Sequence, residues 1–576
     1  MSALRGLPVR SVLRRRFSPI DIAVLIAVLA AIYGVLSVGR GLTVSLSPEG
    51  VSHVSTNPEH LPYDAARSLL RMFTALFFSF VFTLTYGYAA ARSRRAEKVL
   101  IPILDILQSV PVLGFLTFTV TAFIALFPGS ELGLECASIF AIFTAQAWNL
   151  TFSFYQSEKT LPRELDELSR SLRLTRWQRF WKIEVPNGAI GLVWNGMMSF
   201  GGSWFFLVAS EAISVRNQNY HLPGIGSFVG AAIAKGDLGA VGLAIATMIV
   251  LVIGVNVLFW RPLTAWCERY RYETTEAEEV QRSLVLDLIM RSSWPRVIGR
   301  ARRRVAERIG RTMRILGRDD APPPVPDARR RAGDIAFAAV IGAAVIYGGY
   351  RALDFIATAP HAGLHEIPHT FALGAATFAR VAVLLVVATL VWVPVGVWIG
   401  LNPKVARIAQ PVVQVLASFP ANFLFPFAVL AFIKLGISLN IGGVLLMSLG
   451  AQWYILFNAI AGASAIPSDL RETMDVYGVR RWQRWRRLII PGILGAYVTG
   501  GITAAGGAWN ASIVAEVVSY HHTTLTATGL GAYIVENTGN HARLLLGIAV
   551  MCIYVVATNR LLWRRLYRLA ENRYSL

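Results

Sequence analysis

Long apolar segments recur throughout this chain of 576 residues, and each is long enough to cross a bilayer as a single helix. A bilayer core about 30 Å thick needs roughly 20 apolar residues in helical conformation. Only 15% of the residues are charged, whereas a soluble domain carries about 25%. The pattern therefore predicts an all-α polytopic membrane protein. We expect twelve membrane helices, near residues 19–39, 69–91, 101–127, 134–156, 187–210, 238–260, 334–352, 371–400, 409–432, 440–461, 492–515 and 541–563.

The distribution of charge predicts how these helices are oriented. Lysine and arginine number 55 against 34 acidic residues, which gives a formal net charge of +21. The basic residues gather between the apolar segments, and this favours contact with a membrane surface over binding of nucleic acid. The loop at 157–186 is rich in arginine, whereas 128–133 contains neither lysine nor arginine. Because basic loops stay in the cytoplasm, we expect both termini to be cytoplasmic.

The second half of the chain repeats the first. Three motifs return at nearly constant offsets, namely Leu107–Pro111 and Leu416–Pro420, Trp177–Arg179 and Trp482–Arg484, and Gly224–Gly226 and Gly529–Gly531. Each copy holds six apolar segments, an even number, so the two six-helix repeats should share one orientation. This predicts parallel repeats around an axis along the membrane normal, with a shared interface at the centre.

The repeat divides the chain into five segments. A linker at 268–333 carries sixteen arginines, and its part at 296–317 has the spacing of a basic amphipathic helix. Such a helix suits the anionic inner leaflet of a membrane, and a docking surface for a soluble partner is the alternative. We expect a basic tail, first membrane helix and outer loop at 1–64, a first repeat unit at 65–267, the cytoplasmic linker at 268–333, a helix and outer loop at 334–369, and a second repeat unit at 370–576.

One loop is unusual in both copies, and we call its two occurrences the first loop segment (162–186) and the second loop segment (467–491). Each begins and ends with proline and holds a Trp-Gln-Arg motif. Proline followed by acidic residues is typical of a helix start, and Gly478 permits a turn with positive φ. The pattern predicts a helix–turn–helix that continues into the next membrane helix. An ordinary basic juxtamembrane segment is the alternative, but it does not explain the duplicated spacing.

The second loop segment resembles the "EAA" loop of permease subunits in binding-protein-dependent ABC importers. The similar residues are Glu472, then Gly478 after five residues, then Leu488-Ile-Ile-Pro491 after nine more. The run from Gly506 to Glu516 resembles the nitrate/sulfonate/taurine branch of that family. The resemblance implies the type I ABC importer permease fold, in which this loop docks in a groove of an ATPase subunit. The coupling residues that it implies here are Glu167, Arg173, Trp177, Pro186, Glu472, Gly478, Trp482 and Pro491.

The loop segments depart from the family pattern in two places. Thr473 and Met474 replace the two alanines of the second copy, which is a mild change. In the first copy Arg173 occupies the glycine position. Arginine does not adopt positive φ cheaply, so we expect a reshaped turn there and a weaker or different contact with the ATPase.

The partners also follow from the resemblance. The chain has no GxxxxGK[ST] phosphate loop, so we expect it to lack catalytic activity and cofactors, with ATP and Mg bound by two cytoplasmic ABC ATPase subunits, as a homodimer or a heterodimer. A periplasmic or surface-anchored solute-binding protein would deliver the solute, a small anion such as nitrate, bicarbonate, a sulfonate or a carboxylate. The location would be the inner membrane of a bacterium, in contact with lipid and not with nucleic acid. We expect no metal site.

Polar residues near the apolar segments are candidates for a translocation pathway. Glu211 and Glu516 end equivalent segments after Trp204 and Trp509; the alternative is that the two glutamates orient the outer loop. Asn510 lies inside an apolar segment, where it either lines the pathway or bonds to a neighbouring helix.

Four more residues leave alternatives open. Pro111 and Pro420 either bend their helices around the pathway or only begin a helix. Arg71 and Arg380 either attract an anion or, as we favour, extend to the membrane surface. The glycine pairs Gly201–Gly202 and Gly506–Gly507 suit close packing of the two equivalent segments across the centre.

The sequence leaves two alternative classes of membrane protein open. A twelve-helix secondary transporter of the major-facilitator type, driven by protons or ions, also has a long central loop. It would not need the duplicated loop segments, and it should carry ion-coupling acids inside its helices. A membrane scaffold protein gives no reason for the repeated loop at all.

Overall fold

The computed structural model describes residues 55–109, 112–215, 218–267, 283–292, 327–358, 365–479, 481–520 and 523–574, with Gly299 and a few isolated positions before residue 40. Three predictions lie outside these residues. They are most of the first membrane helix, the amphipathic helix at 296–317, and Pro111. Two compact units can be distinguished, one with Met1–Gly41, Ser153–Met197 and Gly254–Pro324, the other with Leu42–Phe152, Met198–Ile253 and Val325–Leu576.

The described residues are almost entirely helical, which confirms the all-α prediction. In the first half the helices are α2 (Leu61–Phe82), α3 (Tyr88–Arg92), α4 (Arg94–Ser109), α5 (Val112–Leu126), α6 (Leu132–Lys159), α7 (Arg163–Ser171), α8 (Arg176–Arg179), α9 (Val185–Glu211), α10 (Ile225–Lys235), α11 (Leu238–Val255), α12 (Arg261–Cys267) and α13 (Leu284–Arg291). In the second half they are α15 (Asp327–Thr358), α16 (Glu366–Gly400), α17 (Pro403–Ser418), α18 (Phe425–Leu435), α19 (Leu439–Ser464), α20 (Ser468–Val476), α21 (Arg481–Arg484), α22 (Ile490–Ala515), α23 (Leu530–Glu536), α24 (His541–Thr558) and α25 (Arg564–Tyr574).

Seven helices among the described residues are long and apolar enough to cross a membrane. An eighth crossing would be a broken one, because α17 and the following helical stretch Ala421–Leu435 meet at an angle of 76°. The segment expected as one helix at 409–432 is therefore interrupted. Phe419 is extended (φ −75°, ψ 128°) before Pro420, as the steric demand of a following proline requires. A bend is therefore present at Pro420, and Pro420 also precedes the helical turn Ala421–Leu424, so both alternatives raised by the sequence apply to it.

Two short β-hairpins were not predicted from the sequence. Strand β1 (Ala212–Val215) pairs with β2 (Gln218–His221), and β3 (Val517–Tyr520) pairs with β4 (Thr523–Thr526), both antiparallel. Each hairpin begins directly after a glutamate, which is Glu211 at the end of α9 and Glu516 next to the end of α22. It returns the chain to the Gly-x-Gly motif that opens α10 or α23. The hairpins thus bring two repeated motifs together.

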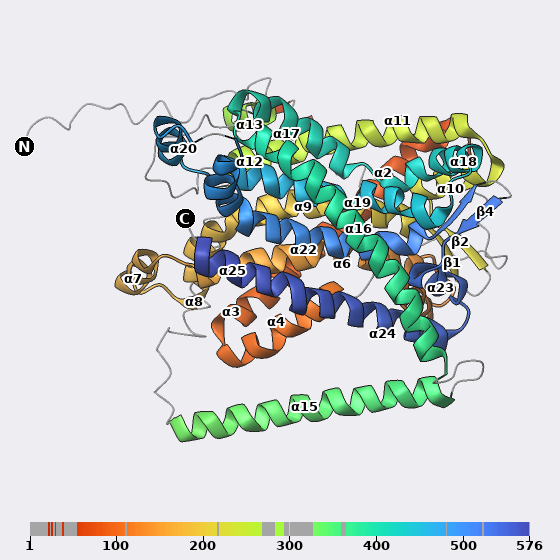
Figure 1. The fold of residues 1–576 in the computed structure, drawn as a ribbon, viewed down its shortest axis with the longest axis horizontal. Helices are drawn as coiled ribbons and strands as arrows, with labels where there is room; N and C mark the ends of the chain where they lie inside the picture. Colours follow the sequence, from red (N-terminus) through yellow and green to blue (C-terminus); the bar gives the residue numbers. More distant parts are fainter. Residues whose placement is uncertain are drawn as a thin grey trace, which may run out of the picture. The chain divides into compact units, whose positions relative to one another are not determined.

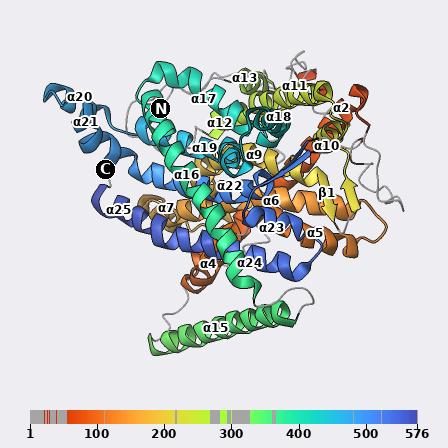
Figure 2. The same cartoon turned by 45° about the vertical axis from the view of Figure 1, so that its right-hand side comes forward.

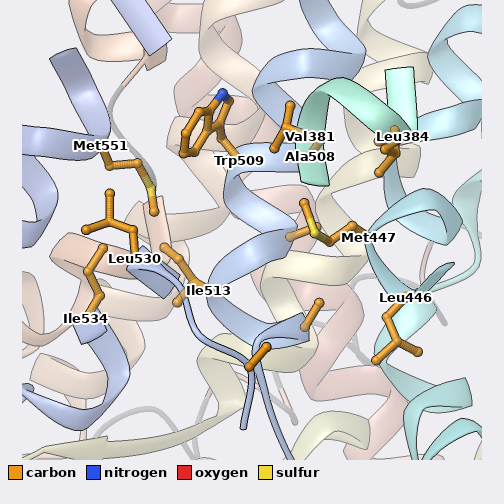
Figure 3. Close-up of a cluster of buried hydrophobic side chains, with 14 of the residues drawn as sticks. Val381, Leu384, Leu446, Met447, Ala508, Trp509, Ile513, Leu530, Ile534 and Met551 are labelled. Carbon is orange, nitrogen blue, oxygen red and sulfur yellow. The ribbon is translucent and has the colours of Figure 1, made fainter. Parts of the chain in front are cut away.

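The second half is built around α16, α19 and α22, which lie side by side (Figures 1 and 2). Glycines permit this contact, since Gly396 of α16 and Gly500 of α22 lie directly against the backbone of α19. Helix α15 contacts α24, and several of its described apolar side chains are exposed, for example Ile346 at 74%. Figure 3 shows the apolar core, with Val381 and Leu384 of α16, Leu446 and Met447 of α19, Ala508, Trp509 and Ile513 of α22, Leu530 and Ile534 of α23, and Met551 of α24.

The packing of α22 against the end of the chain predicts how two glycines respond to one substitution. A Cβ at Gly501 would overlap the indole of Trp563, whereas a Cβ at Gly495 meets nothing within 4 Å. We expect Gly501→Ala to lower the free energy of unfolding by about 1–3 kcal/mol through overpacking. Gly495→Ala should raise it by about 0.5–1 kcal/mol, because alanine favours a helix. Thermal unfolding of the purified protein in detergent measures both, and equal effects would contradict this packing.

Candidate functional site

The second loop segment forms the predicted helix–turn–helix. Helix α20 follows Pro467, and Gly478 adopts φ 63° in the turn after it. The turn is closed by the Val479 amide, which donates to the Met474 carbonyl at 2.9 Å. Residues Trp482–Ala515 then form one continuous helix, with Pro491 in the first turn of α22. The second arm of the loop is therefore the end of the membrane helix itself, as predicted.

The first loop segment has the same turn, and this corrects the expectation that Arg173 reshapes it. Arg173 adopts φ 46°, the one positive φ of a non-glycine residue among the described positions. The Leu174 amide donates to the Ser169 carbonyl at 3.1 Å, equivalent to the bond in the second segment. A left-handed conformation costs an L-residue about 1–2 kcal/mol. The first loop segment thus keeps the turn although Arg173 disfavours a positive φ.

Ion pairs hold the first loop segment in place. Arg179 pairs with Asp166 at 2.6 Å and with the buried Glu184 at 2.8 Å. The equivalent residue in the second segment, Arg484, pairs with Asp475 at 2.7 Å. Since Arg179 joins the short helix α7 to the start of the next helix, these pairs favour the turn that Arg173 opposes.

Both loop segments expose apolar side chains at equivalent positions. Leu172 is 60% exposed and Tyr477 is 79% exposed, each next to the residue with positive φ. Their neighbours add to this surface, with Trp177 and Leu168 in the first segment and Val476 and Trp482 in the second. The predicted coupling residues Glu167 and Glu472 are also exposed. A duplicated surface of apolar and acidic side chains suits the binding of a partner protein.

A second pair of related sites lies in the larger unit, where the glutamates at the ends of α9 and α22 are wholly buried. Arg71 donates to the carboxylate of Glu211 at 2.6 Å, and Ser68 donates to the same oxygen at 2.6 Å. The Gly226 amide donates to the other oxygen at 2.7 Å. We call Ser68, Arg71, Glu211 and Gly226 the first clamp.

The second half repeats this geometry with equivalent residues. Glu516 accepts from Arg380 at 2.6 Å, from Thr377 at 2.7 Å, and from the Gly531 amide at 2.7 Å. These four residues form the second clamp. A Cβ on Gly529 would overlap the Glu516 carboxylate, and a Cβ on Gly224 would overlap that of Glu211. The repeated glycines are thus required because the backbone itself approaches the carboxylate.

The clamps differ in one balanced change of charge. In the first half Glu135 accepts from both Arg67 and Arg71 at 2.5 and 2.6 Å. The equivalent of Glu135 is Asn440, which accepts from Arg380 through its side-chain oxygen at 2.7 Å, and the equivalent of Arg67 is Ala376. One arginine and one glutamate are therefore lost together. A buried charge without a partner is costly, and both halves avoid it.

The clamps settle the alternative raised by the sequence for Arg71 and Arg380 and show the surroundings of the two glutamates. Arg71 and Arg380 do not extend to the membrane surface as we favoured, because both are buried in ion pairs. Glu211 and Glu516 accept hydrogen bonds from the chain beyond the hairpins, and these bonds fix the loops that follow α9 and α22. Trp204 and Trp509 are buried, at 1% and 2% exposed. A role of these four residues in a pathway stays a prediction.

Two further predictions concern the middle of α9 and α22. Asn510 accepts from the Val112 amide at 2.8 Å, so it bonds the start of α5 in the other repeat. The glycine pairs do not pack against each other. A Cβ on Gly202 would overlap the hydroxyl of Tyr454, and a Cβ on Gly507 would lie 3.4 Å from the ring of the same residue. Tyr454 therefore occupies the space expected for a glycine–glycine contact.

The second half has one more polar cluster, at the start of α16. Glu366 pairs with Arg543 at 2.5 Å and accepts from the Tyr533 hydroxyl at 2.9 Å. Burial, together with the bond to Glu366, raises the pKa of Tyr533 to about 12, so this hydroxyl stays a donor at neutral pH. Among the described residues no group of three His, Cys, Asp or Glu side chains could hold a metal ion.

Sequence reasoning missed Arg67, Ser68, Glu135, Thr377 and Asn440, although the first half offered a signal. Arg67 and Glu135 are charged residues near apolar segments, and the repeat aligns them with the uncharged Ala376 and Asn440. Two opposite charges that disappear together between copies indicate a pair in contact.

The comparisons with known proteins agree with the duplication. A family model described as "Binding-protein-dependent transport system inner membrane component" matches residues 83–261 and again residues 392–575. The taurine transport system permease protein TauC of Escherichia coli (strain K12) is 28% identical over 182 residues, which are 31% of this chain and 62% of TauC.

Two other relatives have similar identity. The nitrate import permease protein NrtB of Leptolyngbya laminosa is 24% identical over 189 residues, 32% of this chain and 64% of that protein. The bicarbonate transport system permease protein CmpB of Synechococcus elongatus is 27% identical over 143 residues, 25% of this chain and 50% of CmpB. The matched region thus spans less than two thirds of each of these relatives.

The strained turn predicts a gain of stability from one substitution. Arg173→Gly should raise the free energy of unfolding of the first loop segment by about 1 kcal/mol, because glycine adopts positive φ without cost. Hydrogen exchange of the amides of α7 measures this, and slower exchange is expected. Unchanged or faster exchange would show that the arginine side chain stabilises the turn more than its backbone destabilises it.

The charge difference between the clamps predicts a compensating pair of substitutions. Glu135→Asn or Arg67→Ala alone should destabilise the protein by about 3–5 kcal/mol, because each leaves a buried excess charge. The double variant reproduces the charge of the second clamp and should recover most of that loss. Thermal unfolding in detergent measures all three, with Arg170→Ala, from an exposed pair with Asp166, as a nearly neutral control. Additive losses in the double variant would refute the coupling.

Proposed function

The chain belongs to the family of binding-protein-dependent transport system inner membrane components and carries its domain twice, and from this premise we propose that it is the membrane permease of an ATP-driven importer. Both domains needed for a pathway would lie in one chain. The family does not fit the alternative of a major-facilitator secondary transporter. The termini would face the cytoplasm, as the basic loops indicate.

The observation that carries this proposal is the continuity of the second loop segment with a membrane helix. The exposed Tyr477 and Val476 lie at the turn, and the helix that follows runs without a break from Trp482 to Ala515. A partner that pulled on the turn would move α22 as a rigid lever. The first loop segment repeats the turn and the exposed apolar position, so two levers are available.

Because the chain has two loop segments that continue into membrane helices, we propose that it binds two ATPase subunits. Each loop segment would bind one cytoplasmic ABC ATPase, either as a homodimer or as a heterodimer, and these subunits would bind ATP and Mg. The chain itself would carry no cofactor and catalyse no reaction. A solute-binding protein would deliver the solute to the opposite face of the membrane.

The solute class is proposed from the relatives. Their names specify taurine, nitrate and bicarbonate, which are small solutes that carry an anionic group. We propose that this permease also carries a small anion. The pathway would run between the two repeats, near α9 and α22.

Transport assays test the proposal with these three solutes as labelled probes. Cells that contain the permease with its own ATPase and binding protein should take up at least one probe, and vanadate should stop the uptake. An uncoupler that stops uptake at once, while vanadate has no effect, would instead support an ion-driven carrier and refute the proposal.

Substitution at the turn tests the lever. Gly478→Val should reduce uptake and ATPase stimulation several-fold, because a β-branched residue opposes positive φ by about 1–2 kcal/mol. Gly478→Asn should retain activity, since asparagine tolerates this conformation. Gly436→Val is a matched control, because Gly436 has φ 64° and open space around it, like Gly478, but lies after α18. Equal loss in both valine variants would mean that general destabilisation, and not the lever, explains the effect.

A further inference from the structure

A small cavity of about 20 Å³ lies in the larger unit where α9, α17 and α19 meet. This is room for one water molecule. Its polar lining comes from Gln414 and Ser418 of α17 and Tyr454 of α19, and α9 contributes Gly201 and Gly202. Helix α9 belongs to the first repeat and the other two helices to the second, so the cavity lies at the interface between the repeats.

Close contacts make this place a constriction. A Cβ on Gly201 would lie 2.6 Å from the Ser418 hydroxyl oxygen, and a Cβ on Gly202 would overlap the Tyr454 hydroxyl. Only glycine lets these hydroxyls come so near α9. On its other side Tyr454 packs against Gly507 of α22. The Tyr454 side chain thus contacts glycines of both repeats, Gly202 through its hydroxyl and Gly507 through its ring, and a small movement of α9 or α22 would change the space around it.

The lining is polar but uncharged. Gln414, Ser418 and Tyr454 offer N–H and O–H donors, and none of these three side-chain ends has a hydrogen-bond partner in the described part of the chain. No acidic or basic side chain is among the lining residues. Donors without charge can replace part of the hydration of an anion, while the absence of a fixed positive charge lets the anion leave again.

Two of the three donors differ between the repeats, whereas Ser418 corresponds to Ser109. At the equivalent positions of the first repeat the sequence has Asp105 in place of Gln414 and Asn149 in place of Tyr454. The turns and the clamps are kept in both repeats, whereas these positions have diverged. Such divergence is expected if the solute contacts mainly the lining residues of the second repeat.

We propose that Gln414, Ser418 and Tyr454 form the solute-contact site of the pathway, where a small oxyanion exchanges water for neutral donors. The structure holds the site closed, with room for a single water, so the anion enters only when α9 separates from α17 and α19. This inference rests on the proposed permease function, and it adds the residues that contact the solute and the chemistry that selects it.

A charge substitution and a hydroxyl deletion test the site in the complete importer. Gln414→Asp should reduce uptake of labelled nitrate, taurine or bicarbonate at least tenfold, because a fixed negative charge repels the anion. ATPase activity of the complex should persist. Tyr454→Phe removes one donor and should change the ratio of uptake rates between two probes by about threefold to tenfold, because the two anions differ in how strongly they accept a hydrogen bond from this hydroxyl.

Tyr497→Phe is the matched control, because the Tyr497 hydroxyl bonds Thr389 at 2.9 Å and does not line the cavity. It should leave the ratio unchanged. If Gln414→Asp prevents assembly of the importer, the uptake ratios of Tyr454→Phe decide whether the site contacts the solute. Vanadate-sensitive uptake with unchanged ratios in Tyr454→Phe would overturn the site and leave the permease intact, since the cavity would then be a packing void. Uptake that vanadate does not affect would refute the permease itself.

Discussion

The structure depends on two buried carboxylates that need a full set of donors. A glutamate with no exposure is stable in the interior only when ion pairs and hydrogen bonds replace its hydration. Glu211 and Glu516 obtain these from an arginine, a hydroxyl and a glycine amide. To deliver the amide, the chain must reverse after α9 or α22, and the hairpins do this. One electrostatic requirement thus explains the arginine, the hairpin and the Gly-x-Gly motif in both repeats.

In the loop segments, too, the backbone conformation favours one residue type, but only one of the two segments has that residue. The turn after α20 uses Gly478, whereas the turn after α7 uses Arg173 in nearly the same conformation. Since the backbone bonds are equivalent, the shape of the turn has been retained through a substitution that opposes it. The ion pairs of Arg179 offset that strain. A retained shape that costs energy indicates a constraint from outside the segment, and a bound ATPase would supply one.

The sequence predicted the helical class, the duplication and the helix–turn–helix, because each rests on local spacing or backbone chemistry, and it offered a bend at Pro420 as one of two alternatives. It did not predict the hairpins, whose four-residue strands lack a periodic signal of their own. It also assigned Arg71 and Arg380 to the membrane surface, because the partners that bury them are distant in sequence. The glycine pairs were expected to meet each other, and Tyr454 could not be placed between them without the fold.

The two repeats therefore conserve one set of residues and vary another. The clamps and turns hold the backbone, and there even a change of charge is balanced, as Asn440 and Ala376 replace Glu135 and Arg67. At the cavity no such balance is kept, since Gln414 and Tyr454 correspond to Asp105 and Asn149. In the proposed permease, the repeated clamps and turns would transmit the movement of both loop segments alike, whereas the solute would contact donors that differ between the repeats. Similar clamps and turns are thus compatible with different cavity-lining residues in the two repeats. Because both repeats lie in one chain, each can diverge separately.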